Sequence, residues 1–111
     1  EMNRRLFDGD HATIALGLNN MATAWYALGK TLDAEPLFQQ AVDMTKRLYP
    51  DGHPDTVVRM INLARCRDKL GRRAEALVVA RDAAETAKRI LPDGHPIRDK
   101  CDNLLSDLTV P

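Results

Sequence analysis

The chain has 111 residues, of which 44% are hydrophobic, and its 16 basic residues balance 16 acidic ones. This length suits one folded domain with a modest core. The balanced charge excludes a global field that would recruit nucleic acid or a membrane surface, and no apolar run approaches the roughly 20 residues of a membrane-spanning helix. Two cysteines, Cys66 and Cys101, lack CxxC spacing and are too few for a disulfide scaffold. We therefore expect a reducing, cytoplasmic-type setting.

The first seven residues already belong to a repeating pattern. EMNRRLF at 1–7 matches DMTKRLY at 43–49 when the chain is shifted by 42 residues. We call this shift the repeat period. We interpret residues 1–7 as the tail of a preceding repeat and expect further repeats before Glu1. Asp8 and Asp10, which follow this tail, are predicted to be turn residues.

Residues 10–49 are predicted to form the first complete repeat, built from two helices. Between Thr13 and Leu28, apolar residues recur every three or four positions, which indicates one face of an α-helix. They are Ile14, Leu18, Met21, Ala22, Trp25 and Leu28. Gly29 then supplies a helix stop that tolerates a left-handed backbone. The second helix should begin near Leu32–Asp33, because Pro36 lacks an N–H and is harmless only in a first turn.

Residues 53–91 are predicted to form the second repeat, with helices at about 54–70 and 74–90. A terminal helix is predicted from about Pro96 to Leu108, within a capping segment at 95–109. The phrase PDGHP precedes two of these helices and ends at Pro54 and at Pro96. Its Asp and Gly make a turn, its His lies at or next to the helix cap, and its last Pro takes the first helical position. A repeat period of this length indicates stacked helical hairpins, since such units bury their apolar faces only against each other. Small residues are expected where the helices approach closely: Ala22, Ala34, Ala41 and their partners one repeat period later.

These units resemble the tetratricopeptide repeat in its long, kinesin-light-chain-like version. In the first unit the resemblance is carried by LNNMA, by the Leu28–Gly29 pair, by AEPLFQQA and by the closing DGHP; in the second it is carried by NLA, LG and AEAL. The second unit departs from it where the first has Trp25, Tyr26 and Phe38, since these places hold Arg67, Asp68 and Ala80. The resemblance implies an all-α solenoid, a right-handed superhelix of antiparallel helix hairpins with about two full repeats plus a terminal helix. It also implies a concave wall lined by the first helix of each pair.

Asn20 and Asn62, which lie one repeat period apart, are the first candidates for ligand contacts. An asparagine amide both donates and accepts, so it can pair with a peptide backbone of any sequence. In the family, asparagines at this place clamp extended peptides, and the resemblance implies the same role here. The alternative is that both are solvated surface residues kept by a duplicated repeat. The other candidates on the inner helices are Asn19, Thr23, Tyr26, Arg65, Lys69 and Asn103.

Five basic residues lie within nine positions near Gly71: Arg65, Arg67, Lys69, Arg72 and Arg73. Cations near a helix C-terminus complement the helix dipole, and this is the favoured interpretation. The alternative is that Arg65 and Lys69, one turn apart, attract an acidic peptide or a terminal carboxylate. Both interpretations can hold at once.

The sequence contains no glycine-rich phosphate loop, GxSxG elbow or HExxH motif. His11, His53 and His95 occur once per repeat, too far apart to share a zinc ion, and the two cysteines are too distant along the axis for a disulfide. We therefore expect no enzymatic activity, no cofactor and no metal. We expect a scaffold that binds an extended peptide in its concave groove, and an acidic peptide is one option. The alternatives are a structural spacer or self-association element, and a regulatory arm of a multidomain enzyme.

Overall fold

The computed structural model describes residues 2–110, and for residues 2–10 it describes the backbone alone. These residues form the helices α1 (Met2–Ala27), α2 (Thr31–Leu48), α3 (Pro54–Lys69), α4 (Arg73–Ile90) and α5 (Pro96–Thr109), and residues 2–110 contain no β-strand. The predicted all-α fold is confirmed. The bounds of α3, α4 and α5 agree with the predicted ones to within about one residue.

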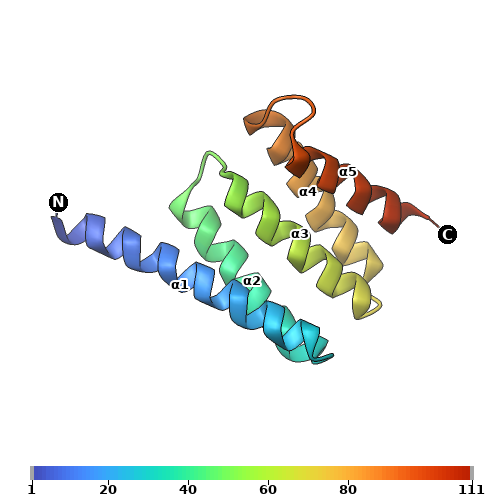
Figure 1. Ribbon diagram of the computed structural model, residues 1–111, viewed down its shortest axis with the longest axis horizontal. Coiled ribbons are helices and arrows are strands. Elements are labelled where there is room, and N and C mark those ends of the chain that lie inside the picture. Colours follow the sequence, from blue (N-terminus) through green and yellow to red (C-terminus); the bar gives the residue numbers. More distant parts are fainter. Residues whose placement is uncertain (1, 111) are drawn as a thin grey trace.

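The helices lie in two layers, with α1, α3 and α5 in front and α2 and α4 behind them (Figure 1). The molecule measures 52 × 35 × 19 Å, and its shortest extent fits two layers of helices packed 8–10 Å apart. Helix α2 packs against both α1 and α3, and α4 packs against both α3 and α5. The chain is thus two stacked helical hairpins followed by a single terminal helix.

The turns inside the two hairpins share one geometry. Gly29 and Gly71 both have a φ of 81°, where a β-carbon would be strained. In the first turn the Gly29 N–H donates to the Tyr26 carbonyl (3.0 Å) and the next N–H donates to the Trp25 carbonyl (2.9 Å). The second turn repeats both bonds at the equivalent positions around Gly71. The predicted glycine stops are confirmed as Schellman-type caps.

The two PDGHP loops end as predicted. Pro54 and Pro96 are the first residues of α3 and α5, and His53 and His95 are their N-caps. The His53 Nδ1 accepts from the Asp55 N–H (3.0 Å), and the His95 Nδ1 accepts from the Ile97 N–H (3.1 Å). Each imidazole therefore satisfies one of the free amides at a helix start.

The prediction of a turn at Asp8 and Asp10 is wrong, because α1 runs unbroken from Met2 to Ala27. Asp8 and Ala12 occupy the places of the two prolines in the later loops, so nothing there blocks a helical hydrogen bond. Asp10 stands where Gly52 and Gly94 adopt positive φ values, which an aspartate disfavours. The interpretation of residues 1–7 as the tail of a preceding repeat stays a prediction, and Glu1 lies outside the described residues.

Helix α2 begins at Thr31, slightly earlier than predicted, so Pro36 lies beyond its first turn. A proline there has no N–H to offer, so the Leu32 carbonyl loses its helical donor. Leu32 is exposed to solvent, which can supply the missing hydrogen bond.

The core lies between the two layers and contains many small side chains. The predicted contact alanines are all fully buried: Ala22, Ala34, Ala41, Ala64, Ala76 and Ala83. They let the helices approach, while the larger buried side chains of α3 and α5 fill the remaining space, among them Met60, Leu63, Leu104 and Leu108.

Candidate functional site

A small hollow opens between α1 and α3 on the face formed by the front layer of helices. Its volume is about 90 Å³, and it is lined by Thr23, Tyr26, Phe38, Asn62 and Arg65. We call these five residues the cup. Four of them come from the two front helices, and Phe38 comes from α2 behind.

The floor of the cup is aromatic. Phe38 is buried and meets the half-buried Tyr26 edge to face, with ring centroids 6.4 Å apart and planes at 71°. Ala22 and Ala64 belong to the same buried cluster, and their small size leaves room for the Phe38 ring between the front helices. Sequence reasoning missed Phe38 because it lies on the second helix of its pair. The sequence does contain one indication of its role, because the first repeat has an aromatic ring at this position where the second repeat has Ala80.

An amide pair spans the two helices beside the cup. The Asn62 Nδ2 donates to the Asn19 Oδ1 at 3.2 Å, and the pair is partly buried. A primary amide has two N–H donors and a carbonyl with two lone pairs, so this bond leaves each asparagine able to make others. The structure therefore brings Asn19 and Asn62 together.

Asn20 does not join this pair. It is exposed, one residue along α1 from the asparagine that Asn62 contacts. The match of Asn20 with Asn62 in the repeat holds, but the structure does not pair the two side chains.

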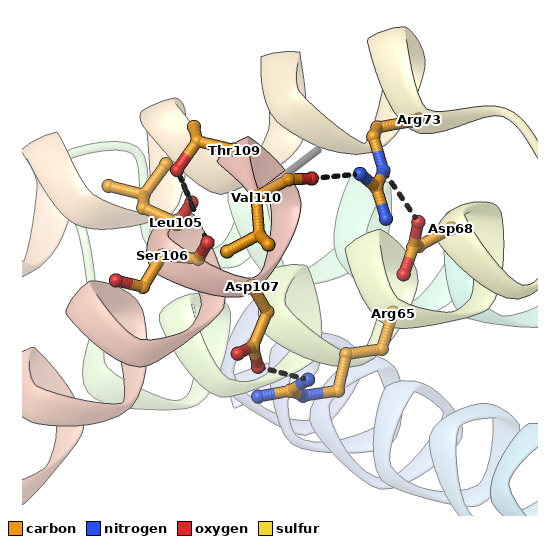
Figure 2. A network of polar contacts seen from close by, with 8 residues as sticks. All are labelled: Arg65, Asp68, Arg73, Leu105, Ser106, Asp107, Thr109 and Val110. Atoms are coloured by element: carbon orange, nitrogen blue, oxygen red, sulfur yellow. Dashed lines mark hydrogen bonds and ion pairs between the residues drawn. The ribbon is translucent and has the colours of Figure 1, made fainter.

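Arg65 connects the cup to the last helix. Its Nη1 lies 3.5 Å from the Asp107 Oδ2, and both side chains are well exposed (Figure 2). An ion pair of this kind is worth only about 0–1 kcal/mol, so the guanidinium stays available to an acidic ligand. Thr23 uses its hydroxyl proton on the Asn19 carbonyl at 2.8 Å and keeps its oxygen as an acceptor.

The last two candidates lie apart from the cup. Lys69 is exposed and borders a separate open hollow of about 420 Å³ next to Gly29 and Thr31, at the end of the hairpins. Asn103 is exposed on α5. Neither lines the cup.

Two of the clustered arginines hold the helices together. The Arg67 Nε lies 3.2 Å from the Glu35 Oε2, and its Nη2 donates to the Gln39 Oε1, so this side chain ties α3 to α2. The Arg73 Nε lies 3.4 Å from the Asp68 Oδ1, and its Nη1 donates to the Val110 carbonyl at 2.6 Å (Figure 2). The basic cluster is therefore in part a structural network, in addition to its favourable place near a helix C-terminus.

The thiols are not placed for chemistry. Cys66 and Cys101 are both free and buried. Burial raises the pKa of the Cys66 thiol to about 11, and it also raises the pKa of Cys101. A protonated, enclosed thiol is a poor nucleophile. Among the side chains of residues 11–110, no group of three His, Cys, Asp or Glu is arranged to hold a metal ion. Within residues 2–110, no helix combines the length and apolar character needed to cross a bilayer.

The geometry agrees with what comparison with known proteins finds. The model of the tetratricopeptide repeat matches residues 10–89. The chain belongs to the tetratricopeptide repeat family. Repeats of this family are in general scaffolds for protein–protein interaction.

Solved structures show the same fold. One of those similar to this chain is a crystal structure of nearly identical TPR-like repeats assigned to a kinesin light chain of Podosopora anserina, with a TM-score of 0.73 and 22% sequence identity. The match covers 85% of this chain and 44% of that one, so this chain spans less than half the length of that neighbour. No curated protein matches the chain.

Proposed function

We propose that the front face of α1, α3 and α5 binds an extended peptide segment of a partner protein. The observation that carries this proposal is the Asn19–Asn62 amide pair beside the cup. The unused donors and acceptors of the pair suit a peptide backbone, and the cup suits one side chain of the same peptide. The two buried free thiols suit a reducing, cytoplasmic-type setting for this function.

The size and lining of the cup restrict the side chain that fits. A volume of about 90 Å³ equals roughly three water molecules, which suits a short aliphatic group. The rings of Tyr26 and Phe38 favour an apolar group at this place. Arg65 at the edge favours a carboxylate on a neighbouring peptide residue, since charge-assisted hydrogen bonds to guanidinium are strong.

A peptide library screened against the wild type and against asparagine variants tests the proposal. Asn62→Ala should weaken binding about tenfold for every peptide sequence, because it removes a backbone contact worth about 1–1.5 kcal/mol. Adding Asn20→Ala should change little, since Asn20 lies outside the pair. Gln40→Ala, an exposed amide on α2, is the matched control and should bind like the wild type. Equal binding by the wild type and by the Asn20→Ala, Asn62→Ala double variant would remove the amide clamp.

A charge variant tests the preference for acidic peptides. Arg65→Gln should reduce affinity for peptides with Asp or Glu and leave neutral peptides unaffected. Lys69→Gln, which removes the same charge outside the cup, is its control. Loss of affinity for neutral and acidic peptides alike would contradict a role for Arg65 in selecting charge.

A second function, self-association, is favoured by an apolar stripe on α1. The stripe consists of Ile14, Leu18, Met21 and Trp25 on α1 and of Leu28, which directly follows this helix. Three of its members are 48%, 55% and 71% exposed, namely Ile14, Met21 and Leu28. Among the equivalent positions of the second repeat, Arg67 contacts Glu35 and Gln39 of α2, and Thr56, Met60 and Leu63 are buried. In a second copy, or in a longer array, another helix would cover the stripe in the same way.

Sedimentation velocity over a range of concentrations tests this second function. The wild type should shift toward a dimer as concentration rises, and Met21→Glu should stay monomeric, because a charge at the centre of the stripe opposes burial. Glu85→Lys, an exposed change on α4, serves as the control. A wild type that stays monomeric at every concentration would exclude self-association.

A further inference from the structure

A second hollow lies away from the cup, where the first PDGHP loop meets the end of α4. Its volume is about 220 Å³. Its lining includes Lys46, Gly52, Thr56, Asp82, Thr86 and Arg89. We call this hollow the loop cleft. We propose that the loop cleft binds a small oxyanion, that is, a phosphoryl or a carboxylate group.

A buried hydroxyl beside the loop cleft has no hydrogen-bond partner among the described residues. Thr56 is only 2% exposed, and its Oγ1 is the buried side-chain polar atom that finds no hydrogen-bond partner among the described residues. Native proteins rarely leave such groups unpaired, because a buried donor without an acceptor is destabilising. The loop cleft beside Thr56 is where an acceptor would sit.

Two cationic side chains line the loop cleft and can donate hydrogen bonds to a ligand. The Lys46 Nζ lies 2.8 Å from the Asp82 Oδ2, but both side chains are about half exposed, so this pair is weak and easily shared with a ligand. The Arg89 Nη1 donates to the Asp51 carbonyl at 2.7 Å, which leaves further guanidinium N–H groups. The charged residues that line the cleft are thus two cations, Lys46 and Arg89, and one carboxylate, Asp82, and this excess of positive charge favours an anionic ligand.

The second PDGHP loop has an arginine at the position equivalent to Thr56. Arg98 occupies the place one repeat period after Thr56, and its Nη1 donates to the Leu91 carbonyl (3.3 Å) and lies 2.6 Å from the Asp93 Oδ1. The second loop therefore satisfies its own polar groups with a side chain from the following helix. Thr56 is too short to reach back in this way, so the first loop leaves its cleft open.

The wall of the loop cleft is closely packed. A β-carbon at Gly52 would lie 3.1 Å from the Ile90 Cγ2 and 3.3 Å from the Thr86 Cγ2, so the loop sits directly on α4. Gly52 also has a φ of 103°, which only glycine adopts readily. A fixed wall reduces the ordering cost when a ligand binds.

The test is the thermal unfolding temperature of the chain in inorganic phosphate, compared with sodium chloride of equal ionic strength. Phosphate should raise this temperature, because a ligand that binds only the folded state stabilises it. Sodium acetate is a parallel arm that presents a carboxylate. A rise with phosphate alone, with acetate alone or with both supports the proposal and identifies the group. No rise with either overturns it.

Paired variants separate a built site from general screening of charge. The Lys46→Gln, Arg89→Gln double variant should lose at least about tenfold in affinity for the anion, since each change removes a charge-assisted hydrogen bond. The control is the Arg47→Gln, Arg81→Gln double variant, which removes two exposed arginines from the same two helices. An equal response of the two double variants to phosphate would overturn the proposal.

Thr56→Val provides a measurement that does not depend on charge. Valine matches threonine in shape without the hydroxyl, so the variant should unfold at a higher temperature than the wild type in sodium chloride. It should also respond less to the stabilising anion. A lower unfolding temperature together with a full response to the anion would overturn the proposal, because the hydroxyl would then have a structural partner unrelated to the ligand.

The loop cleft and the cup lie on different parts of the molecule and share no residue. The variants of one leave the other intact, so failure of either proposal does not affect the other.

Discussion

Helices α1 and α3 hold equivalent places in the two repeats but have very different surroundings. Met21 on α1 is 55% exposed, whereas Leu63, its counterpart in the second repeat, is 1% exposed. Ile14 is exposed and its counterpart Thr56 is buried. The difference arises because α3 packs against both α2 and α4, while α2 is the only helix within residues 2–110 that packs extensively against α1. In a stack of repeats, a residue's neighbours decide its burial as much as its own chemistry does.

The exposed surfaces at the two ends of the stack also differ, in polarity. The outer surface of α5 is polar, with Asp99, Asp102 and Ser106 exposed. The outer surface of α1 carries the apolar stripe instead. Terminal repeats that close a stack have polar outer faces, so the polar surface of α5 suits the capping segment expected at 95–109, which stays a prediction.

Truncation of the matched pair Leu63 and Met21 should show the largest contrast between the two helices. Leu63→Ala should lower the free energy of unfolding by about 2–5 kcal/mol, because it leaves a cavity under α2. Met21→Ala should lower it by less than about 1 kcal/mol, because the side chain is half exposed. Urea denaturation followed by circular dichroism measures both. Similar losses at the two positions would show that the α1 stripe is covered in solution.

Two ion pairs should give the next largest contrast. Arg67 is partly buried where α2 and α3 meet, between Glu35 and Gln39. Arg67→Ala should lower the free energy of unfolding by about 1–3 kcal/mol, because it leaves Glu35 without its partner. Arg65→Ala breaks an exposed pair with Asp107 and should cost at most about 0.5 kcal/mol. Chemical denaturation of both variants, with the Arg67→Ala, Glu35→Ala double variant to isolate the coupling, measures this difference. A cost for Arg65→Ala equal to that for Arg67→Ala would contradict it.

The cysteines allow a finer comparison, because Cys66 on α3 corresponds to the exposed Ala24 on α1. Cys66 should react with a thiol reagent at least about a hundredfold more slowly than an exposed cysteine, because only opening of the fold exposes Cys66. The exposed cysteine is introduced by Ala24→Cys in a chain that lacks Cys66 and Cys101. Colorimetric thiol assays measure both rates. Equal rates would mean that α2 does not cover α3 in solution.

The same thiol predicts how stability depends on pH. Its pKa is raised to about 11 in the folded chain, above the ordinary value of about 8.5. The unfolded chain therefore releases this proton first as pH rises, so the contribution is fully present below about 8.5 and is lost as pH rises toward 11. Cys66→Ala should remove this part of the alkaline loss, which denaturation at pH 8 and at pH 10.5 can detect. An unchanged alkaline slope would contradict it.

The sequence predicted most of the fold because the helix ends are chemically explicit. Gly29 and Gly71 stop helices through positive φ, and Pro54 and Pro96 start them. The prediction was wrong at Asp8 and Asp10, where the letters DGDH resemble a PDGHP loop but lack both prolines. The repeat pattern predicted a turn, but without the two prolines the backbone can stay helical, and it does.

The site was less predictable, because it depends on which side chains meet across a seam. The match of Asn20 with Asn62 identified the right kind of residue, but the side chain that Asn62 contacts is Asn19. A repeat period relates equivalent positions, whereas contacts join positions that are not equivalent. Phe38 was missed for a related reason, since α2 in the back layer supplies the floor of a hollow on the front face.

The central claim is that the seam between α1 and α3 is the binding surface. Its most direct test is a chemical-shift map of the isotopically labelled chain, titrated with the tightest-binding peptide from the library. We predict the largest shifts at Asn62, Thr23 and Tyr26, with small shifts at Gln40 and Glu85 on the back layer. Shifts concentrated on Ile14, Met21 and Leu28, or on the back layer, would contradict the account.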